Sequence, residues 1–182
     1  MVFDREGNLA SLQRPVLRAM GCSNNGHVTT KQALLKELVI GRDLVLLNWS
    51  EDWDELIDLI RTIRNKATSP DPFVGLVVLS SELIKSRSRG ALDAGANSLV
   101  TVPFAAGHIM AHVKHVTTKQ WRFIDAPNYF GPDRRVHSEI IEHDERREGQ
   151  CRMLEGAELV AERLRMRSTA LAAFEIKVAH TA

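Results

Sequence analysis

The sequence has little that would indicate a metal or redox centre. Its two cysteines, Cys22 and Cys151, do not have the short spacing of a zinc or dithiol site. Two thiols without such a pattern are typical of a protein in a reducing cytosol. His108 and His112 lie four residues apart, but no acidic third ligand is near them. We therefore expect a solvated helix face at these histidines, and no metal or cofactor.

The sequence also lacks an excess of charge of one sign and long apolar runs. The chain has 24 basic and 23 acidic residues and a formal net charge of +1, so no bulk field attracts nucleic acid. The longest apolar runs have the length of a strand, and neither a signal peptide nor a membrane span is predicted. The glycine loops that bind phosphates and the Gly-x-Ser-x-Gly turn of hydrolases are missing. We expect a cytoplasmic protein that is not an enzyme.

What is present is an alternation of short strands and helices of about ten residues. At 182 residues and 44% hydrophobic, the chain can bury one sizeable core plus an extension. Pro15 predicts a kink in the first helix, or a late start of it. Alternation with short loops predicts a parallel sheet covered on both faces. Helical spacing is found over 9–20, 31–38 and 54–64, and strands are predicted at 27–29, 43–49, 73–79 and 99–104.

Several motifs follow one another in a characteristic order between residues 43 and 104. The apolar run DLVLLNW (43–49) delivers a polar side chain at its end, and LVTVPF (99–104) ends in Pro-Phe. Between them lie an amphipathic helix, a strand ending in two serines, and the segment ALDAGA (91–96). This order resembles the CheY-like receiver domains of response regulators. The resemblance implies a doubly wound, flavodoxin-like sheet of five parallel strands over residues 1–119.

The resemblance also identifies the positions that handle phosphate in receivers, and several are altered. The acceptor aspartate of the family falls on Asn48, whose amide cannot form an acyl phosphate. The acidic pair that holds magnesium falls on Asp4 and Arg5, and an arginine supplies no ligand oxygen. The phosphate-binding lysine falls on Val102. This set of changes indicates that phosphoryl chemistry has been abandoned.

Two further positions concern the conformational switch of the family. The phosphate-sensing hydroxyl is kept as Ser80, whereas the aromatic switch residue falls on Leu99, which has no ring to flip. The bond before Pro103 is a candidate cis peptide by resemblance. We expect a permanently locked state in which Arg5 fills the place of the metal beside Asp4. The alternative is that the polar residues of the pocket are ordinary loop residues.

Residues 120–149 are predicted to form an extended charged arm, because few core-forming residues occur there. Tyr129 and Phe130 precede Arg134 and Arg135, and aromatic and arginine side chains are enriched at interface hot spots. We expect these four residues to anchor a partner. The alternative is a solvated linker whose charges pair among themselves.

Residues 150–180 are predicted to form a helix with an apolar seam. Arg167 interrupts the seam and could pair with Glu162 or Glu175 of a neighbouring chain. We expect a homodimer in which Leu164, Leu171 and Phe174 are buried. The alternative is that the helix folds back onto the side of its own receiver formed by the last two helices and the last strand. The seam consists of Met153, Ala157, Val160, Leu164, Arg167, Leu171, Phe174 and Val178.

Taken together, these patterns predict a bacterial two-component-type signal transduction protein. We expect a phosphorylation-independent pseudo-receiver that acts as a protein-interaction module and binds a protein partner in its pathway. One alternative is a phosphorelay receiver with a non-standard acceptor. Another is a nucleic-acid-binding regulator that uses the arginine arm, although the balanced net charge argues against nucleic acid.

Overall fold

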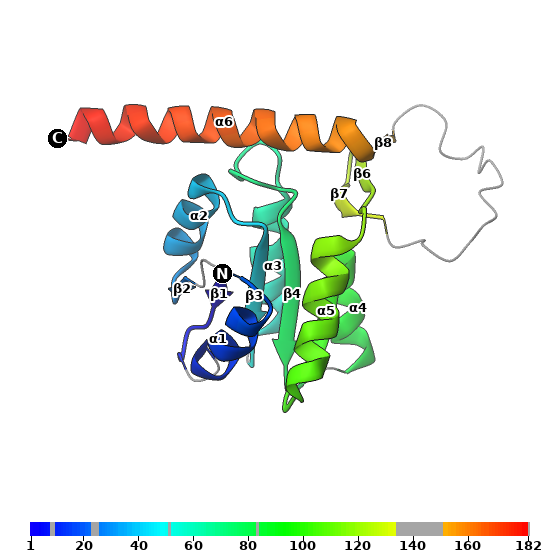
Figure 1. Cartoon of the computed structure of the whole chain (residues 1–182). Coiled ribbons are helices and arrows are strands. Elements are labelled where there is room, and N and C mark those ends of the chain that lie inside the picture. The colour runs from blue at the N-terminus through cyan, green and yellow to red at the C-terminus, as the bar shows by residue number, and fades with distance from the viewer. Residues whose placement is uncertain (8–9, 23–25, 51, 83, 134–150, 182) are drawn as a thin grey trace.

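A sheet of five parallel strands forms the centre of the molecule (Figure 1). The computed structural model describes residues 1–182 except 8–9, 23–25, 51, 83, 134–150 and 182, and without the side chains of residues 12 and 176–181. The strand order β2-β1-β3-β4-β5 confirms the predicted doubly wound sheet. Its strands are β1 (Val2–Phe3), β2 (His27–Val28), β3 (Leu44–Asn48), β4 (Gly75–Ser80) and β5 (Ser98–Thr101).

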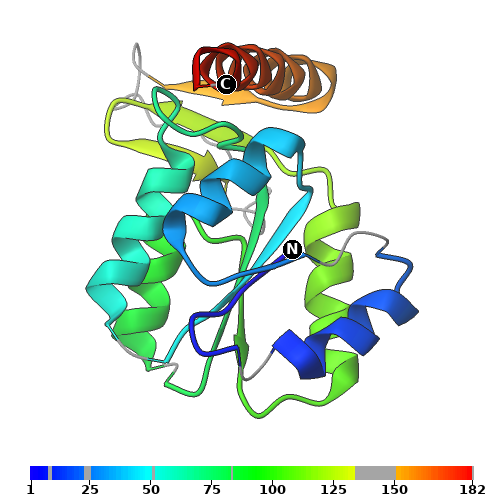
Figure 2. The same cartoon turned by 90° about the vertical axis from the view of Figure 1, so that its left-hand side faces the viewer.

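Helices cover both faces of this sheet (Figure 2). Because side chains alternate along a strand, Val45 and Leu47 of β3 enter one core, while Leu44 and Leu46 enter the other. The first core receives α2, α3 and α4, and the second receives α1 and α5. Pro15 lies inside α1 without delaying its start. The helices are α1 (Ala10–Ala19), α2 (Lys31–Ile40), α3 (Trp53–Arg64), α4 (Lys85–Ala94) and α5 (Ala106–Thr118).

Part of the predicted arm folds into a second, antiparallel sheet. Its strands β6 (Phe123–Ala126), β7 (Tyr129–Pro132) and β8 (Arg152–Leu154) have the order β7-β6-β8. The ring of Phe73 lies 5.1 Å from the rings of both Phe123 and Phe130. Phe130, expected to anchor a partner, therefore packs on its own chain. Tyr129 donates a hydrogen bond to the carbonyl of Pro132 at 2.9 Å, and Arg134 and Arg135 lie outside the described residues.

The C-terminal helix α6 (Gly156–Thr181) runs across the end of the parallel sheet where its strands begin (Figure 1). The carboxylate of Asp71, which is 0% exposed, accepts hydrogen bonds from Arg163 Nη2 at 2.9 Å and from Arg167 Nε at 2.8 Å. Both arginines also donate to the carbonyl of Arg42, at 3.1 and 2.7 Å. The expected pairing of Arg167 with a neighbouring chain is therefore wrong, because a buried carboxylate of the same chain binds it.

The helix thus folds back, as in the alternative prediction, but on a different side of the parallel-sheet domain. It lies beside α2 and the start of β4, not on the side formed by α4, β5 and α5. Phe174 lines a hollow against the parallel-sheet domain together with Val39 and Pro70. Met153 is in β8, so the helix begins later than predicted, and the side chain of Val178 lies outside the described residues. The arginines select this orientation because the fully buried Asp71 requires cationic partners.

None of the described helices is long and apolar enough to cross a bilayer.

Asp71→Asn should weaken the attachment of α6 and lower the free energy of unfolding by about 2–3 kcal/mol, because two arginines lose a buried anion. Urea denaturation followed by circular dichroism measures this change. Asp58→Asn is the matched control, since Asp58 is exposed on α3 and only 3.6 Å from exposed Arg61. We expect an effect within about 0.5 kcal/mol for the control. Equal effects of the two substitutions would contradict the role given to Asp71.

Candidate functional site

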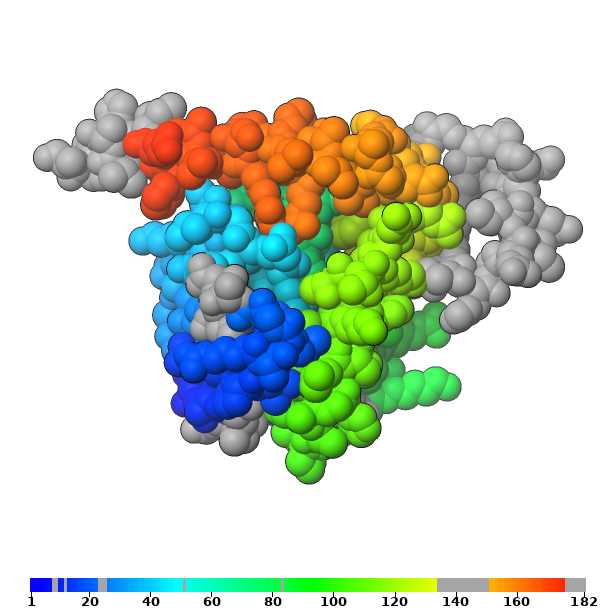
Figure 3. Space-filling view, in the orientation of Figure 1, coloured from blue at the N-terminus to red at the C-terminus, as the bar shows by residue number. Residues whose placement is uncertain are grey.

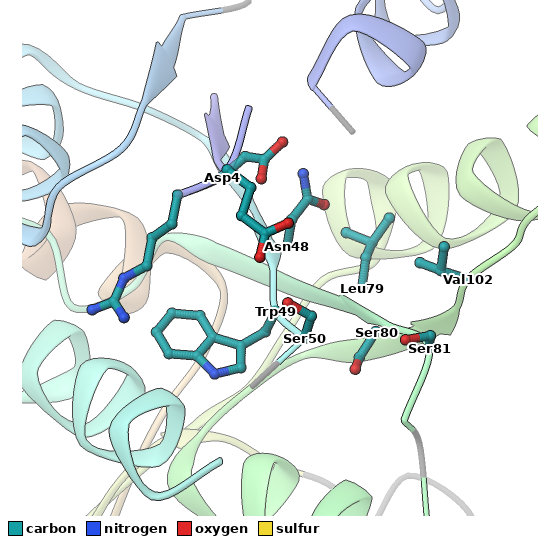
Figure 4. Close-up of a pocket in the computed structure, with 10 residues that line it drawn as sticks. Asp4, Asn48, Trp49, Ser50, Leu79, Ser80, Ser81 and Val102 are labelled. Carbon is teal, nitrogen blue, oxygen red and sulfur yellow. The ribbon is translucent and has the colours of Figure 1, made fainter. Parts of the chain in front are cut away.

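A pocket of about 260 Å³ lies where β1, β3 and β4 end (Figure 4). This edge of an open parallel sheet is the usual place for ligands in such folds. The pocket brings together all five residues that the sequence assigned to it. Leu99, expected at the switch position, is instead packed against the core formed with α2, α3 and α4. The lining residues are Asp4, Arg5, Glu6, Asn48, Trp49, Ser50, Leu79, Ser80, Ser81 and Val102.

Asn48, which the resemblance assigned to the acceptor position, is bound to a glutamine of α1. Gln13 Nε2 donates to Asn48 Oδ1 at 2.5 Å, and Asn48 Nδ2 donates to Gln13 Oε1 at 3.3 Å. Both side chains are buried, Gln13 completely. A pair of amides of this kind satisfies both partners without any net charge. The position therefore offers neither a carboxylate to phosphorylate nor an anion to hold a cation.

Gln13 was not identified from the sequence, although a signal for it exists. Ala10, Gln13 and Leu17 share one buried face of α1 at steps of three and four residues. A glutamine at such a core position requires a buried polar partner. The sequence alone does not show which residue supplies it, because Asn48 lies on a distant strand.

Asp4, at the remaining acidic position, is buried at the end of β1. Its Oδ2 accepts a hydrogen bond from the backbone N–H of Ala10 at 3.0 Å, where α1 begins. The first N–H groups of a helix lack partners within the helix, and a carboxylate there is favoured by the helix dipole. Asp4 thus stabilises the start of α1 in the present arrangement.

Arg5 turns toward α3 rather than filling the place of a metal. Its Nη1 donates to Glu55 Oε2 at 2.7 Å, and its Nη2 donates to the other oxygen of the same carboxylate. Its guanidinium carbon lies 5.0 Å from the centre of the Trp49 ring. In place of the expected position beside Asp4, the guanidinium makes a two-pronged ion pair and a ring contact. This pair is half-exposed and contributes about 0–1 kcal/mol.

Ser80 and Val102 close the opposite wall of the pocket (Figure 4). Ser80 is buried, and its Oγ accepts a hydrogen bond from the N–H of Glu82 at 3.1 Å. The N–H of Val102 donates to the carbonyl of Ser80 at 3.0 Å, which places an apolar side chain where receivers have an amine. The Val102–Pro103 bond is cis, as the resemblance implies.

One histidine of α5 contacts the neighbouring strand β5. His112 Nδ1 lies 2.5 Å from Ser98 Oγ on β5. Burial lowers the pKa of His112 below its usual value, and the neighbouring His115 and His108 lower it further. Across the described part of the chain, no three His, Cys, Asp or Glu side chains are grouped so that they could hold a metal ion.

Comparison with known proteins places the fold among the receivers. No family model and no curated protein matches the chain. A response regulator from Thermotoga maritima is similar over 65% of this chain and 96% of its own length, with 24% identity and a TM-score of 0.53. The chemotaxis protein CheY4 of Vibrio cholerae gives a TM-score of 0.54 at 13% identity, over 63% of this chain and 94% of that protein.

A third similar structure concerns the metal directly. It is the receiver domain of a sensor histidine kinase from Pseudomonas aeruginosa, with a magnesium ion coordinated in its active-site cleft. It has 15% identity and a TM-score of 0.52, over 65% of this chain and 95% of that one. In the present pocket Asn48 is bound to Gln13, and Arg5 is paired with Glu55 at the rim. Asn48 and Arg5 supply no anionic oxygen to a divalent cation, and the carboxylates that line the pocket are those of Asp4, whose Oδ2 binds the N–H of Ala10, and of Glu6.

Gln13→Ala should lower the free energy of unfolding by about 1–3 kcal/mol, because the buried amide of Asn48 loses its partner. Thermal and urea denaturation measure the change. Gln32→Ala on α2 is the matched control, since Gln32 is exposed in a helix of the same length. The control should change stability by less than about 0.5 kcal/mol. If Gln13→Ala left the free energy of unfolding unchanged, the amide pair would not be needed for stability.

Proposed function

We propose that this chain is a bacterial two-component-type signalling protein whose receiver works without phosphorylation, as a protein-interaction module. The observation that carries the proposal is the amide pair between Asn48 and Gln13 at the acceptor position. A receiver needs a carboxylate there, since only a carboxylate forms the acyl phosphate. An amide that is fully engaged by a second amide supports a fixed pocket.

The surroundings of Asn48 support the same conclusion by their charge. A phosphoryl group carries about two negative charges, which must be neutralised by cations in a buried site. Val102 provides no charge, and the guanidinium of Arg5 is bound to Glu55. The acceptor carboxylate and the cations that would neutralise its phosphoryl group are therefore absent together, as expected if no phosphoryl group is bound. One loss without the others would leave an unbalanced charge in the pocket.

The switch elements favour a single conformation. Ser80 Oγ is engaged by the backbone of Glu82, and Leu99 packs against the core as an aliphatic side chain. A receiver that responds to phosphate needs at least two states with different affinity for the phosphorylated pocket. In this proposal the surface that binds the partner does not change with phosphorylation. The signal then depends on whether the protein is present.

A phosphorelay receiver with a different acceptor is the second candidate. Glu6 lines the pocket beside Asp4, so carboxylates are present within it. Asp4 already binds the start of α1, which leaves Glu6 as the more accessible of the two. Identification of any phosphorylated residue separates this candidate from the first.

Incubation with acetyl phosphate and magnesium should leave the wild-type chain unlabelled in intact-protein mass spectrometry. Asn48→Asp alone should remain almost unlabelled, because Arg5 and Val102 still fail to supply the metal ligand and the cation. The triple variant Arg5→Asp, Asn48→Asp, Val102→Lys should gain one phosphoryl group. Arg5→Asp with Val102→Lys, which lacks the acceptor, is its control. Wild-type labelling at Asp4 or Glu6 would support the phosphorelay instead.

A further inference from the structure

Large apolar side chains that face solvent gather around α6. Val160, Leu164 and Leu171, which we call the α6 stripe, are 55%, 57% and 44% exposed. Met153 in β8 and Ile40 at the end of α2 are also exposed, and both of these elements adjoin α6. In the rest of the described chain, the exposed large apolar side chains are those of Ile84 and Met110. Such a concentration is typical of an interaction surface.

The stripe cannot be buried by a rotation of the helix. Arg163 and Arg167 hold the adjacent face of α6 on the buried Asp71, and Leu159 and Met166 pack against the aromatic cluster beneath it. The helix lies along the outside of the molecule in the space-filling view (Figure 3). The residues of the stripe follow at steps of four and seven, so they share one face of the helix. The stripe therefore stays in water unless another molecule covers it.

The charges of α6 favour a second copy of the chain over a strongly acidic or basic partner. Its described charged residues include Glu158, which binds Arg152, and Glu162, which binds Arg165. Arg163 and Arg167 are neutralised by Asp71 and Asp43 together. The helix presents no field of one sign, so an oppositely charged partner would gain little. Two copies, in contrast, bring together the apolar side chains of the stripe, and in an antiparallel arrangement that pairs the two leucines the exposed Glu175 meets Val160 of the other copy rather than a like charge.

The positions of the two leucines are self-complementary. A two-fold axis perpendicular to α6, passing between Arg167 and Ser168, places Leu164 opposite Leu171 of the other copy, and the reverse. A two-fold interface requires such mutual contacts. The helix has 26 residues and is about 39 Å long at 1.5 Å per residue, which provides several turns on each side of the axis.

From this geometry we infer that the chain forms a symmetric dimer by antiparallel packing of two α6 stripes. Each receiver keeps its own α6 attached through Asp71, so the dimer joins complete domains and exchanges no segments. The pocket at the ends of β1, β3 and β4 lies at the opposite end of the parallel sheet and remains accessible in both copies. This inference is independent of whether the pocket is phosphorylated.

Sedimentation velocity on the full chain tests the dimer. At micromolar concentrations the wild type should sediment with twice the mass of the 20.4 kDa chain. Leu164→Glu with Leu171→Glu should raise the dissociation constant at least about a hundredfold, since buried charges at an interface centre are unpaired. Ile84→Glu with Met110→Glu, which also replaces two exposed apolar side chains, is the control and should remain dimeric. Circular dichroism melting checks that every variant is folded.

Disulfide cross-linking tests the antiparallel register in a background with Cys22→Ser and Cys151→Ser. A mixture of Leu164→Cys and Leu171→Cys chains should form disulfides between the two populations, while each variant alone should form few. Efficient cross-linking of Leu164→Cys with itself would overturn the antiparallel arrangement. A monomeric wild type, or a dimer that survives the two glutamates, would overturn the α6 interface as a whole.

Discussion

The position of α6 on the rest of the chain depends on one buried carboxylate. Asp71 stands just before β4 and is completely shielded from solvent, so its charge must be met by cations of the protein. Arg163 and Arg167, one turn apart on α6, provide them. This contact determines which face of α6 is turned inward. It fixes the helix at the end of the sheet opposite the pocket, and it leaves the stripe of Val160, Leu164 and Leu171 outside.

In the proposed function, the pocket keeps the architecture of a receiver site without its phosphoryl chemistry. The strand ends, the serine and the cis Val102–Pro103 bond are those expected of a receiver. Its polar groups, however, are used within the protein: Asn48 binds Gln13, Asp4 binds the start of α1, and Arg5 binds Glu55. Each of these contacts stabilises the fold itself. In the proposed function, the pocket is therefore a structural junction between α1, β3 and α3.

The fold was largely predictable because its signals are local. Continuous apolar runs identified β3 and β4, and the same motifs that carried the resemblance implied the strand order and the cis proline. The second sheet was not predicted, because it depends on Phe73 packing against Phe123 and Phe130, some fifty residues away in sequence. The extended arm was predicted from the few core-forming residues within it, and the ring of Phe73 lies outside that segment.

The same limit applies to individual side chains of the site and of α6. The resemblance assigned Asn48, Ser80 and Val102 to one site, and the structure brings them together. The partners of Arg5 and Arg167 did not follow, because a long cation can reach several acids and the three-dimensional fold decides between them. Titration of the isotope-labelled wild-type chain with beryllofluoride and magnesium, followed by amide NMR spectra, tests the central claim most directly. We predict unchanged signals around Asn48, Ser80 and Val102, whereas saturable shifts of these signals would show a working phosphate site and contradict the account.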